Sequence, residues 1–194
     1  SGRGLQPITK TPVHPKVWEK INGIINDQGY VLAEPYLNKA ADLAFQFEIQ
    51  KGKVTYLGIS NFFTESKGQY QGNYINGIPA KIDREVIEFL ENMPGILVGP
   101  IINIIEKSRL ALLYEGNFGI DTLIFRDEKN QLKINPCLEI NVRQNMGLIS
   151  LQLEKLVSPD KMAQYRMFYE PGQTFKGFKT EMTKKHPPKF LNGK

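Results

Sequence analysis

An alternating stretch from Asp42 to Gln50 constrains the fold more than any other feature of this sequence. In an extended strand its large apolar residues share one face: Leu43, Phe45, Phe47 and Ile49. The other face carries Asp42, Ala44, Gln46 and Glu48. The pair Lys51-Gly52 predicts a tight turn, and Val54 to Ile59 predicts the returning strand. The chain is therefore expected to contain an antiparallel sheet with one strongly apolar face.

A second hairpin is predicted from Gly116 to Phe125 and Leu132 to Val142, joined across Asp127 to Asn130. Tyr30 to Leu37 is predicted to be a strand that Pro35 ends or places at an edge, and Asn61 to Ile78 a loop or an irregular strand pair. Four helices are predicted. The first covers Val17 to Asp27 and is stopped by Gly29, and the second begins at Arg84, is capped by Asp83 and breaks at Pro94-Gly95. The third covers about Pro100 to Leu113 and the fourth Gly147 to Leu156. Pro159 to Met167 is a candidate extension of the last helix, and the remainder is expected to be largely coil. Antiparallel hairpins separated by helices predict an α+β fold of antiparallel β-sheets with packed helices rather than a parallel Rossmann sheet.

Size and composition favour an ordinary globular chain. With 194 residues, 41% of them hydrophobic, it has enough apolar material for one domain, or one domain plus a lobe. No stretch approaches the roughly 20 apolar residues of a membrane span, and no signal peptide opens the sequence, so a cytoplasmic location without a membrane partner is expected. Cys137 is the single cysteine and is expected to be a buried thiol. The net charge of +5 is modest and spread out, and the densest basic group, near the C-terminus, is expected to be a solvated tail rather than a nucleic-acid site.

The strand within Ile134 to Gly147 carries the residues of greatest chemical interest. Its apolar set, expected in the core, is Leu138, Ile140 and Val142. Glu139, Asn141 and Arg143 lie on the other face, which is compatible either with solvent or with a divalent cation beside a phosphate. Asp121 lies near the start of the partner strand and is expected close to Glu139, or else is a turn or hydrogen-bonding aspartate after Gly119. No Walker sequence and no convincing Ser/His/Asp or Cys/His set is present.

Three segments together resemble the C-terminal nucleotide-binding half of the ATP-grasp superfamily. G-N-F-G-I-D-T-L-I-F with I-N-P-C-L-E-I-N-V-R resembles that family's paired metal-binding strands. V-L-A-E-P-Y-L at 31–37 resembles its adenine hinge, and S-G-R-G-L at 1–5 its glycine-rich loop over the phosphates.

The resemblance implies a role for each matching residue. Glu139 and Asn141 would be Mg²⁺ ligands, with Asp121 as a supporting ligand or a residue behind the ligands. Arg143 would contact the transferring phosphoryl group or the substrate carboxylate. Glu34 would accept hydrogen bonds from the ribose. The adenine slot would be lined by Ala33, Pro35, Tyr36 and Leu37, and the phosphate loop would contain Gly2, Arg3 and Gly4. Asp42 is either a further acidic residue after the hinge or an ordinary strand aspartate.

The implied activity is that of an ATP- and Mg²⁺-dependent ligase, which activates a carboxylate as an acylphosphate for attack by an amine or thiol. Residues 1–157 would form the ATP-grasp C-terminal domain, with the metal-binding hairpin at 116–143, and residues 158–194 a partly irregular extension. The family's N-terminal lobes are absent from this sequence, so an incomplete cleft, weak or absent turnover and self-association through uncovered surface are expected. The alternative is a non-catalytic ATP-grasp-like domain that acts as a weak nucleotide-binding or protein-interaction module. A single-strand nucleic-acid binder that stacks bases on Phe62, Tyr70 and Tyr74 is the least favoured hypothesis.

Overall fold

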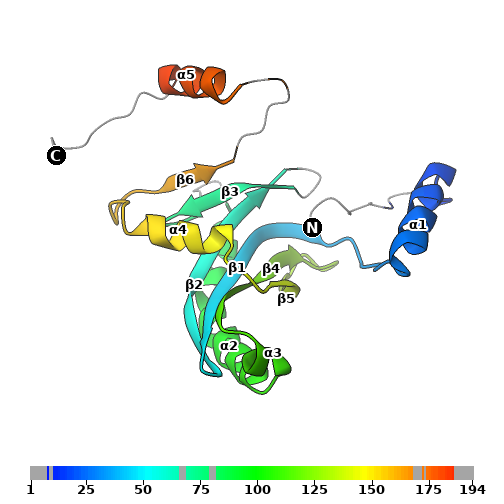
Figure 1. Ribbon diagram of the computed structural model, residues 1–194, viewed down its shortest axis with the longest axis horizontal. Helices are drawn as coiled ribbons and strands as arrows, with labels where there is room; N and C mark the ends of the chain where they lie inside the picture. The colour runs from blue at the N-terminus through cyan, green and yellow to red at the C-terminus, as the bar shows by residue number, and fades with distance from the viewer. Residues whose placement is uncertain are drawn as a thin grey trace.

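One six-stranded antiparallel sheet organises the chain, with the strand order β5-β4-β1-β2-β3-β6 (Figure 1). The computed structural model describes residue 8, residues 11–65, 69–78 and 82–167, residue 172 and residues 174–185. The strands are β1 Asn38–Gln50, β2 Lys53–Thr64, β3 Tyr70–Ile75, β4 Gly116–Arg126, β5 Leu132–Asn141 and β6 Ala163–Arg166. The helices are α1 Pro15–Gln28, α2 Arg84–Glu106, α3 Arg109–Leu113, α4 Met146–Glu154 and α5 Phe175–Lys185. The predicted α+β class with an antiparallel sheet is confirmed.

Strand β1 lies inside the sheet, between β2 and β4, and is buried on both faces. The predicted hairpin with β2 is confirmed, and Lys51 (φ 51°) and Gly52 (φ 74°) form the turn with two positive φ angles that fits the twist of the strands. The apolar face of β1 is fully buried at Leu43, Phe45, Phe47 and Ile49. The opposite face is buried at Ala44 and Gln46 because α4 covers it.

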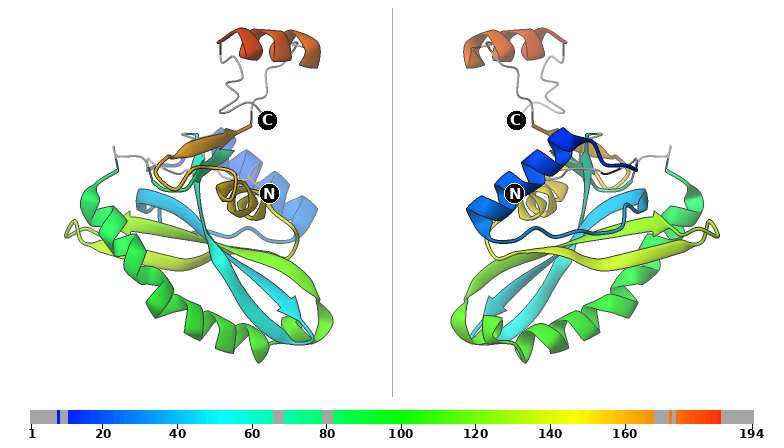
Figure 2. Two further views of the ribbon diagram at one scale, coloured as in Figure 1. Left: turned by 90° about the vertical axis from the view of Figure 1, so that its left-hand side faces the viewer. Right: turned by 90° about the vertical axis from the view of Figure 1, so that its right-hand side faces the viewer.

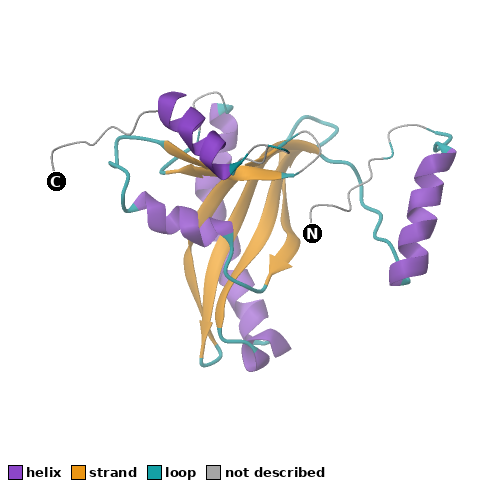
Figure 3. Cartoon of the chain, turned by 45° about the horizontal axis from the view of Figure 1, so that its top comes forward, coloured by secondary structure: helices purple, strands orange, loops and turns teal. Residues whose placement is uncertain are grey.

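The sheet lies between two helical layers (Figure 3). Helix α2 packs on the apolar face and joins the core through Val86, Leu90, Met93 and Ile105. Helix α4 packs on the other face, where Leu151 meets Gly58. The predicted helices at Val17 to Asp27 and Gly147 to Leu156 are confirmed as α1 and α4, and Gly29 ends α1 in the left-handed region with φ 83°.

The predicted helix break at Pro94-Gly95 is wrong. Helix α2 continues through both Pro94 and Pro100, and only the short α3 follows it. Each proline removes one backbone hydrogen bond, but residues at helical spacing keep facing the sheet beyond it. Burial of Leu97 and Ile101 against the core therefore sustains the helix. Asp83 does occupy the N-cap position, but its carboxylate makes an ion pair with Arg126 (3.1 Å) and gives no side-chain cap.

Three further sequence predictions are wrong, and one open alternative is resolved. Tyr30 to Leu37 is irregular and largely exposed, because no neighbouring strand pairs with it in the described chain. Pro159 to Met167 does not extend α4 but contains β6, which pairs with β3, and the expected C-terminal coil contains α5. Of the two alternatives predicted for Asn61 to Ile78, the structure has the irregular strand pair.

The apolar set of β5 and Cys137 are exposed, contrary to prediction. Leu138 is 43% and Ile140 42% exposed, because β5 is an edge strand whose start alone, at Leu132 and Ile134, packs against the core. Val142, which was predicted on the same face, lies just after β5 and is 41% exposed. Among the described residues, no helix combines the length and the apolarity needed to cross a membrane.

Candidate functional site

The central feature of the site is the pairing of two acidic residues across β4 and β5. Asp121 lies opposite Glu139, and Gly119 lies opposite Asn141. On the other side of β4, Ala44 of β1 lies opposite Asp121. Directly paired residues of antiparallel strands project from the same face of a sheet. Asp121, Glu139 and Asn141 therefore share one face, the face that α4 partly covers.

Hydrogen bonds link this set to Arg143. Asn141 Nδ2 donates to Asp121 Oδ2 (3.1 Å), and Arg143 Nη2 donates to Asn141 Oδ1 (3.0 Å). A backbone bond from Arg143 N to Asn141 O (2.9 Å) closes the turn that follows β5. The sequence predicted that Asp121 and Glu139 lie close together, and their direct pairing across β4 and β5 confirms this. The structure brings Asp121, Glu139, Asn141 and Arg143 into one cluster.

Burial of Asp121 raises the pKa of its carboxyl from 3.8 to about 6. The hydrogen bond from Asn141 and the charge of Arg143 lower this pKa, and the carboxylates of Glu139 and Asp42 raise it. Like charges opposed in a ladder destabilise it, so the ionised cluster carries an electrostatic cost. Positive charge placed between Asp121 and Glu139 would relieve that cost.

The oxygen donors of the cluster fit a small hard cation. Carboxylate and amide oxygens are the ligands that Mg²⁺ takes in proteins. The cluster supplies two carboxylates and one amide, while no three His, Cys, Asp or Glu side chains of the described chain are grouped to hold a metal. A cation here would therefore use Asn141 Oδ1 with Asp121 and Glu139, and would need further ligands from a substrate or water.

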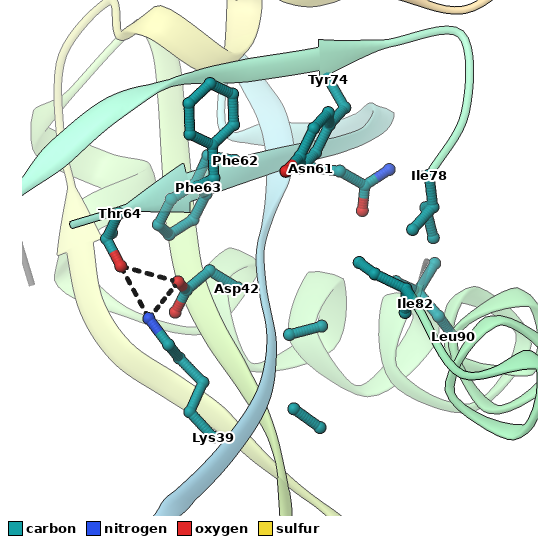
Figure 4. Close-up of a pocket in the computed structure, with 12 residues that line it drawn as sticks. Lys39, Asp42, Asn61, Phe62, Phe63, Thr64, Tyr74, Ile78, Ile82 and Leu90 are labelled. Atoms are coloured by element: carbon teal, nitrogen blue, oxygen red, sulfur yellow. Dashed lines mark hydrogen bonds and ion pairs between the residues drawn. The ribbon is translucent and has the colours of Figure 1, made fainter. Parts of the chain in front are cut away.

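Asp42 extends the acidic side of the cluster towards a small cavity. Its carboxylate accepts from Lys39 Nζ (2.7 Å) and from Thr64 Oγ1 (3.2 Å), and Lys39 also donates to Thr64 (2.6 Å) (Figure 4). The cavity beside them has about 160 Å³ and is lined further by Phe62, Phe63 and Tyr74. Sites for small molecules usually have about 300–1,000 Å³. This cavity alone is too small to enclose a nucleotide, and the four cluster residues do not line it.

The predicted hinge is not part of this cluster. Ala33, Glu34, Pro35 and Tyr36 are exposed, and Leu37 is half-buried. Within the described chain, Glu34 makes no hydrogen bond or ion pair with the cluster. The segment does lead directly into β1, whose Lys39 and Asp42 form the network with Thr64. Gly2, Arg3 and Gly4 lie outside the described residues.

A polar junction under α4 positions the cluster and was missed by sequence reasoning. Asn145 Oδ1 caps α4 by accepting from Gly147 N (2.9 Å) and Leu148 N (3.2 Å). Beneath it, Gln46 Nε2 donates to Ser60 Oγ (3.0 Å), and both side chains are fully buried. An asparagine before a helical stretch is an N-cap signal that identifies Asn145 from sequence. The burial of Gln46 has no such signal, because it depends on α4 docking across β1.

Two glycines make this junction possible. A Cβ on Gly147 would lie 2.2 Å from Gln46 Nε2 and 2.3 Å from Ser60 Oγ. A Cβ on Gly119 would lie 2.6 Å from Asn145 Nδ2 and 2.9 Å from Gln46 Oε1. These last two atoms are buried without a hydrogen-bond partner among the described residues. Close backbone approach at both glycines thus sets the α4 N-terminus directly beside Asn141 and Arg143.

No family model and no curated protein matches this sequence, whereas several solved structures do. One is the biotin carboxylase–β,γ-ATP complex of Campylobacter jejuni, with 15% identity over 70% of this chain and 27% of that chain, and a TM-score of 0.43. Another is N5-carboxyaminoimidazole synthetase of Staphylococcus aureus complexed with ADP, with 20% identity, coverage of 62% and 31%, and a TM-score of 0.34. A protein of Archaeoglobus fulgidus assigned to the ATP-grasp superfamily matches with 15% identity, coverage of 71% and 42%, and a TM-score of 0.37. The chain is similar to ATP-grasp proteins. It spans less than half the length of these three structures, and at TM-scores below 0.5 the likeness carries no argument about the site.

Proposed function

We propose that this chain is the nucleotide-binding part of an ATP-grasp ligase and that Asp121, Glu139 and Asn141 hold Mg²⁺ against the phosphates of ATP. The observation that supports this most is the opposed pair Asp121–Glu139, joined through Asn141 to the guanidinium of Arg143. Two carboxylates that repel each other, beside a fixed cation, match the needs of a metal–polyphosphate complex. An ordinary solvated strand face has no such requirement.

Each residue of the cluster has a separate task in this proposal. Asn141 holds Asp121 through its amide nitrogen and keeps its oxygen available to a metal as well as to Arg143, because a carbonyl oxygen has two lone pairs. Arg143 is exposed and reaches outward, where it would contact the transferring phosphoryl group or a substrate carboxylate. Mg²⁺, when bound, would neutralise charge on the phosphate oxygens.

The proposed reaction transfers the γ-phosphoryl group of ATP to a carboxylate. The acylphosphate is then attacked by an amine or thiol, and phosphate leaves. Positioning and charge neutralisation dominate such a transfer, so no protein nucleophile is needed. This agrees with a cluster made only of acidic, amide and guanidinium groups. When nucleotide is bound, it would cover the segment 31–37. Ala33 to Leu37 would then contact the adenine, and Glu34 the ribose.

Calorimetric titration of ATP with and without Mg²⁺ tests the metal site. Wild-type protein should bind ATP measurably only with Mg²⁺. Glu139→Ala and Asn141→Ala should each weaken that binding at least about tenfold, as the loss of a metal-site group typically does. Glu128→Ala, an exposed glutamate on the turn of the same hairpin, is the matched control and should leave the affinity unchanged. Unaltered binding in both cluster variants would show that the metal assignment is wrong.

The exposure of Glu139 and of the segment 31–37 supports the second candidate function, a module that binds nucleotide without turnover. Chemistry of this kind requires exclusion of water from the reacting groups. Measuring ADP release from Mg²⁺-ATP, with carboxylates and hydroxylamine as acceptor, separates the two. ADP formation that depends on Arg143 supports the ligase, and tight binding without ADP supports the module.

A further inference from the structure

The outer side of α2 is a long helix face that no described element covers (Figure 2). The inner side of the helix is buried against the sheet through Val86, Leu90, Met93 and Ile105. On the outer side, Ile96 is 58% exposed. From Asn92 to Ile105 the helix contains no charged residue, a length of about four turns. A solvated helix face is normally charged, so this surface is typical of a contact surface.

Six exposed residues form one stripe along this face, separated by steps of four, four, three, four and four residues: Glu88, Asn92, Ile96, Gly99, Asn103 and Lys107. Steps of three and four keep residues on one side of a helix. Read from either end, the stripe is charge, amide, small or aliphatic residue, then the same in reverse. The two ends carry opposite charges, since Glu88 is at one end and Lys107 at the other.

We propose that this stripe is the interface of a two-fold homodimer in which α2 packs antiparallel against α2 of a second copy. A two-fold axis between Leu97 and Val98 opposes each stripe residue to its mirror position. Glu88 then faces the partner subunit's Lys107, and Asn92 faces the partner subunit's Asn103. Gly99 faces the partner subunit's Ile96, and because no atom lies within 4 Å of the Gly99 Cβ position, there is space for that side chain.

Charge complementarity favours a second copy of this chain as the partner and an antiparallel direction of the two α2 helices. Antiparallel packing makes two Glu88–Lys107 pairs, whereas parallel packing would oppose like charges at both ends. Antiparallel packing also aligns opposite helix dipoles. Glu88 already accepts from Arg84 Nε (2.8 Å) through Oε1, but both side chains are mostly exposed, and the second carboxylate oxygen remains open to a partner. Lys107 makes no ion pair within the part of the chain that the structure describes.

A charge-swap experiment with sedimentation equilibrium on the whole 194-residue chain tests the dimer. Wild-type protein should be a monomer–dimer system. Glu88→Lys and Lys107→Glu should each weaken association by about tenfold, because each replaces two symmetry-related attractions with repulsions. The double variant E88K/K107E restores both pairs with reversed sign and should return the dimerisation constant to near the wild-type value. Lys129→Glu, an exposed change of the same charge on the β4–β5 turn, is the control and should have no effect.

The double variant also separates this interface from general charge effects. Circular dichroism of every variant should match wild type, since the three positions are exposed. A wild-type chain that stays monomeric at all accessible concentrations would overturn the proposal. So would a double variant no better than the single ones, or a Lys129→Glu variant as weak as Lys107→Glu. ATP binding plays no part in the readout, so the dimer and the proposed ligase function succeed or fail independently.

Discussion

Asp121 is the residue at which this fold accepts an electrostatic cost. Its carboxyl is largely buried and is opposed by Glu139, and a second carboxylate, Asp42, lies within electrostatic reach. A residue chosen for stability alone at this ladder position would be neutral or apolar. Perturbed groups in clusters of charged side chains are frequent at functional sites, which agrees with the metal site proposed above.

The raised pKa of Asp121 predicts how stability depends on pH. The pKa of the carboxyl is 3.8 in its ordinary state, which represents the unfolded chain, and about 6 in the folded protein. Between these two pH values the folded state therefore binds the proton more tightly than the unfolded state. The free energy of unfolding therefore falls as pH rises through this window, and the full penalty is present above it. Asp121→Asn removes the charge. The change that it causes in the free energy of unfolding should be more favourable at pH 8 than at pH 4 by about 1 kcal/mol, a value that is reduced because the side chain is partly exposed to solvent. Urea denaturation at the two pH values measures this difference.

The matched control is Asp160→Asn, the same replacement at an exposed aspartate. It should shift the urea midpoint equally at pH 4 and pH 8. A pH-independent effect of Asp121→Asn would mean that the carboxyl titrates normally and that the cluster is well solvated. If Asp121→Asn instead lost stability at pH 8, the attraction of the ionised carboxylate to Asn141 and Arg143 would outweigh its repulsion by Glu139.

At the residue scale, sequence reasoning succeeded where contacts are local. The proximity of Asp121 and Glu139 follows from two adjacent strands joined by a short turn. The Lys39–Asp42–Thr64 network was not predictable, because it depends on the pairing of β1 with β2 far from their turn. The burial of Gln46 has the same origin, since α4 comes from a segment about a hundred residues away along the chain.

At the scale of elements, the predictions failed where tertiary burial overrides local propensity. Proline and glycine at 94 and 95 are strong local stop signals, yet α2 passes through them because its apolar stripe continues against the sheet. The opposite error occurred at Tyr30 to Leu37, where β-prone residues pair with no strand of the described chain. Periodicity correctly located the two hairpins, α1 and α4, although α1 contains no buried residue and most of β5 is exposed.

The docking of α4 is expected to depend on Gly147. A methyl group there would overlap Gln46 Nε2 and Ser60 Oγ, and neither buried side chain has solvent to move into. Gly147→Ala should therefore lower the free energy of unfolding by about 1–3 kcal/mol, as overpacking of a close contact does. It should also weaken Mg²⁺-dependent ATP binding, because α4 carries the Asn145 cap beside Arg143. Chemical denaturation and calorimetry measure the two effects.

Gly23→Ala is the matched control, a second helical glycine with no atom within 4 Å of its Cβ position. Alanine is the better helix former, so this variant should be as stable as wild type or slightly more so. If Gly147→Ala behaved like Gly23→Ala, the close approach of α4 to β1 would not exist in solution.

At the scale of the whole molecule, the strand order is the property least accessible from the sequence. Hairpins fix only the neighbours β1–β2 and β4–β5. The pairing of β1 with β4 joins segments separated by the whole of α2 and α3, and it places Asp42 near Asp121. The pairing of β3 with β6 adds residues 163–166 to the same sheet. Non-local pairings of this kind depend on which faces are left to bury, which no local pattern specifies.

The last strand is expected to protect the edge of the sheet. Strand β6 pairs with β3, Met167 N donates to Gln71 O (2.9 Å), and the Arg166 guanidinium lies 5.5 Å from the centre of the Phe63 ring. Asn76 Nδ2 holds the preceding turn by donating to the carbonyls of Ser158 (3.0 Å) and Lys161 (2.8 Å). Without β6, the backbone groups of β3 would form an open edge.

Two truncations test this role, one ending at Met167 with β6 retained and one ending at Val157 without it. The longer variant should keep the urea midpoint of the whole chain. The shorter one should lose about 1–3 kcal/mol, because several backbone hydrogen bonds and the Asn76 contacts disappear, and it should self-associate through β3. Denaturation and light scattering report the two effects. Equal stability of both variants would mean that the sheet ends at β3, and the segment from Ser158 onward would then be an appendage rather than part of the folded unit.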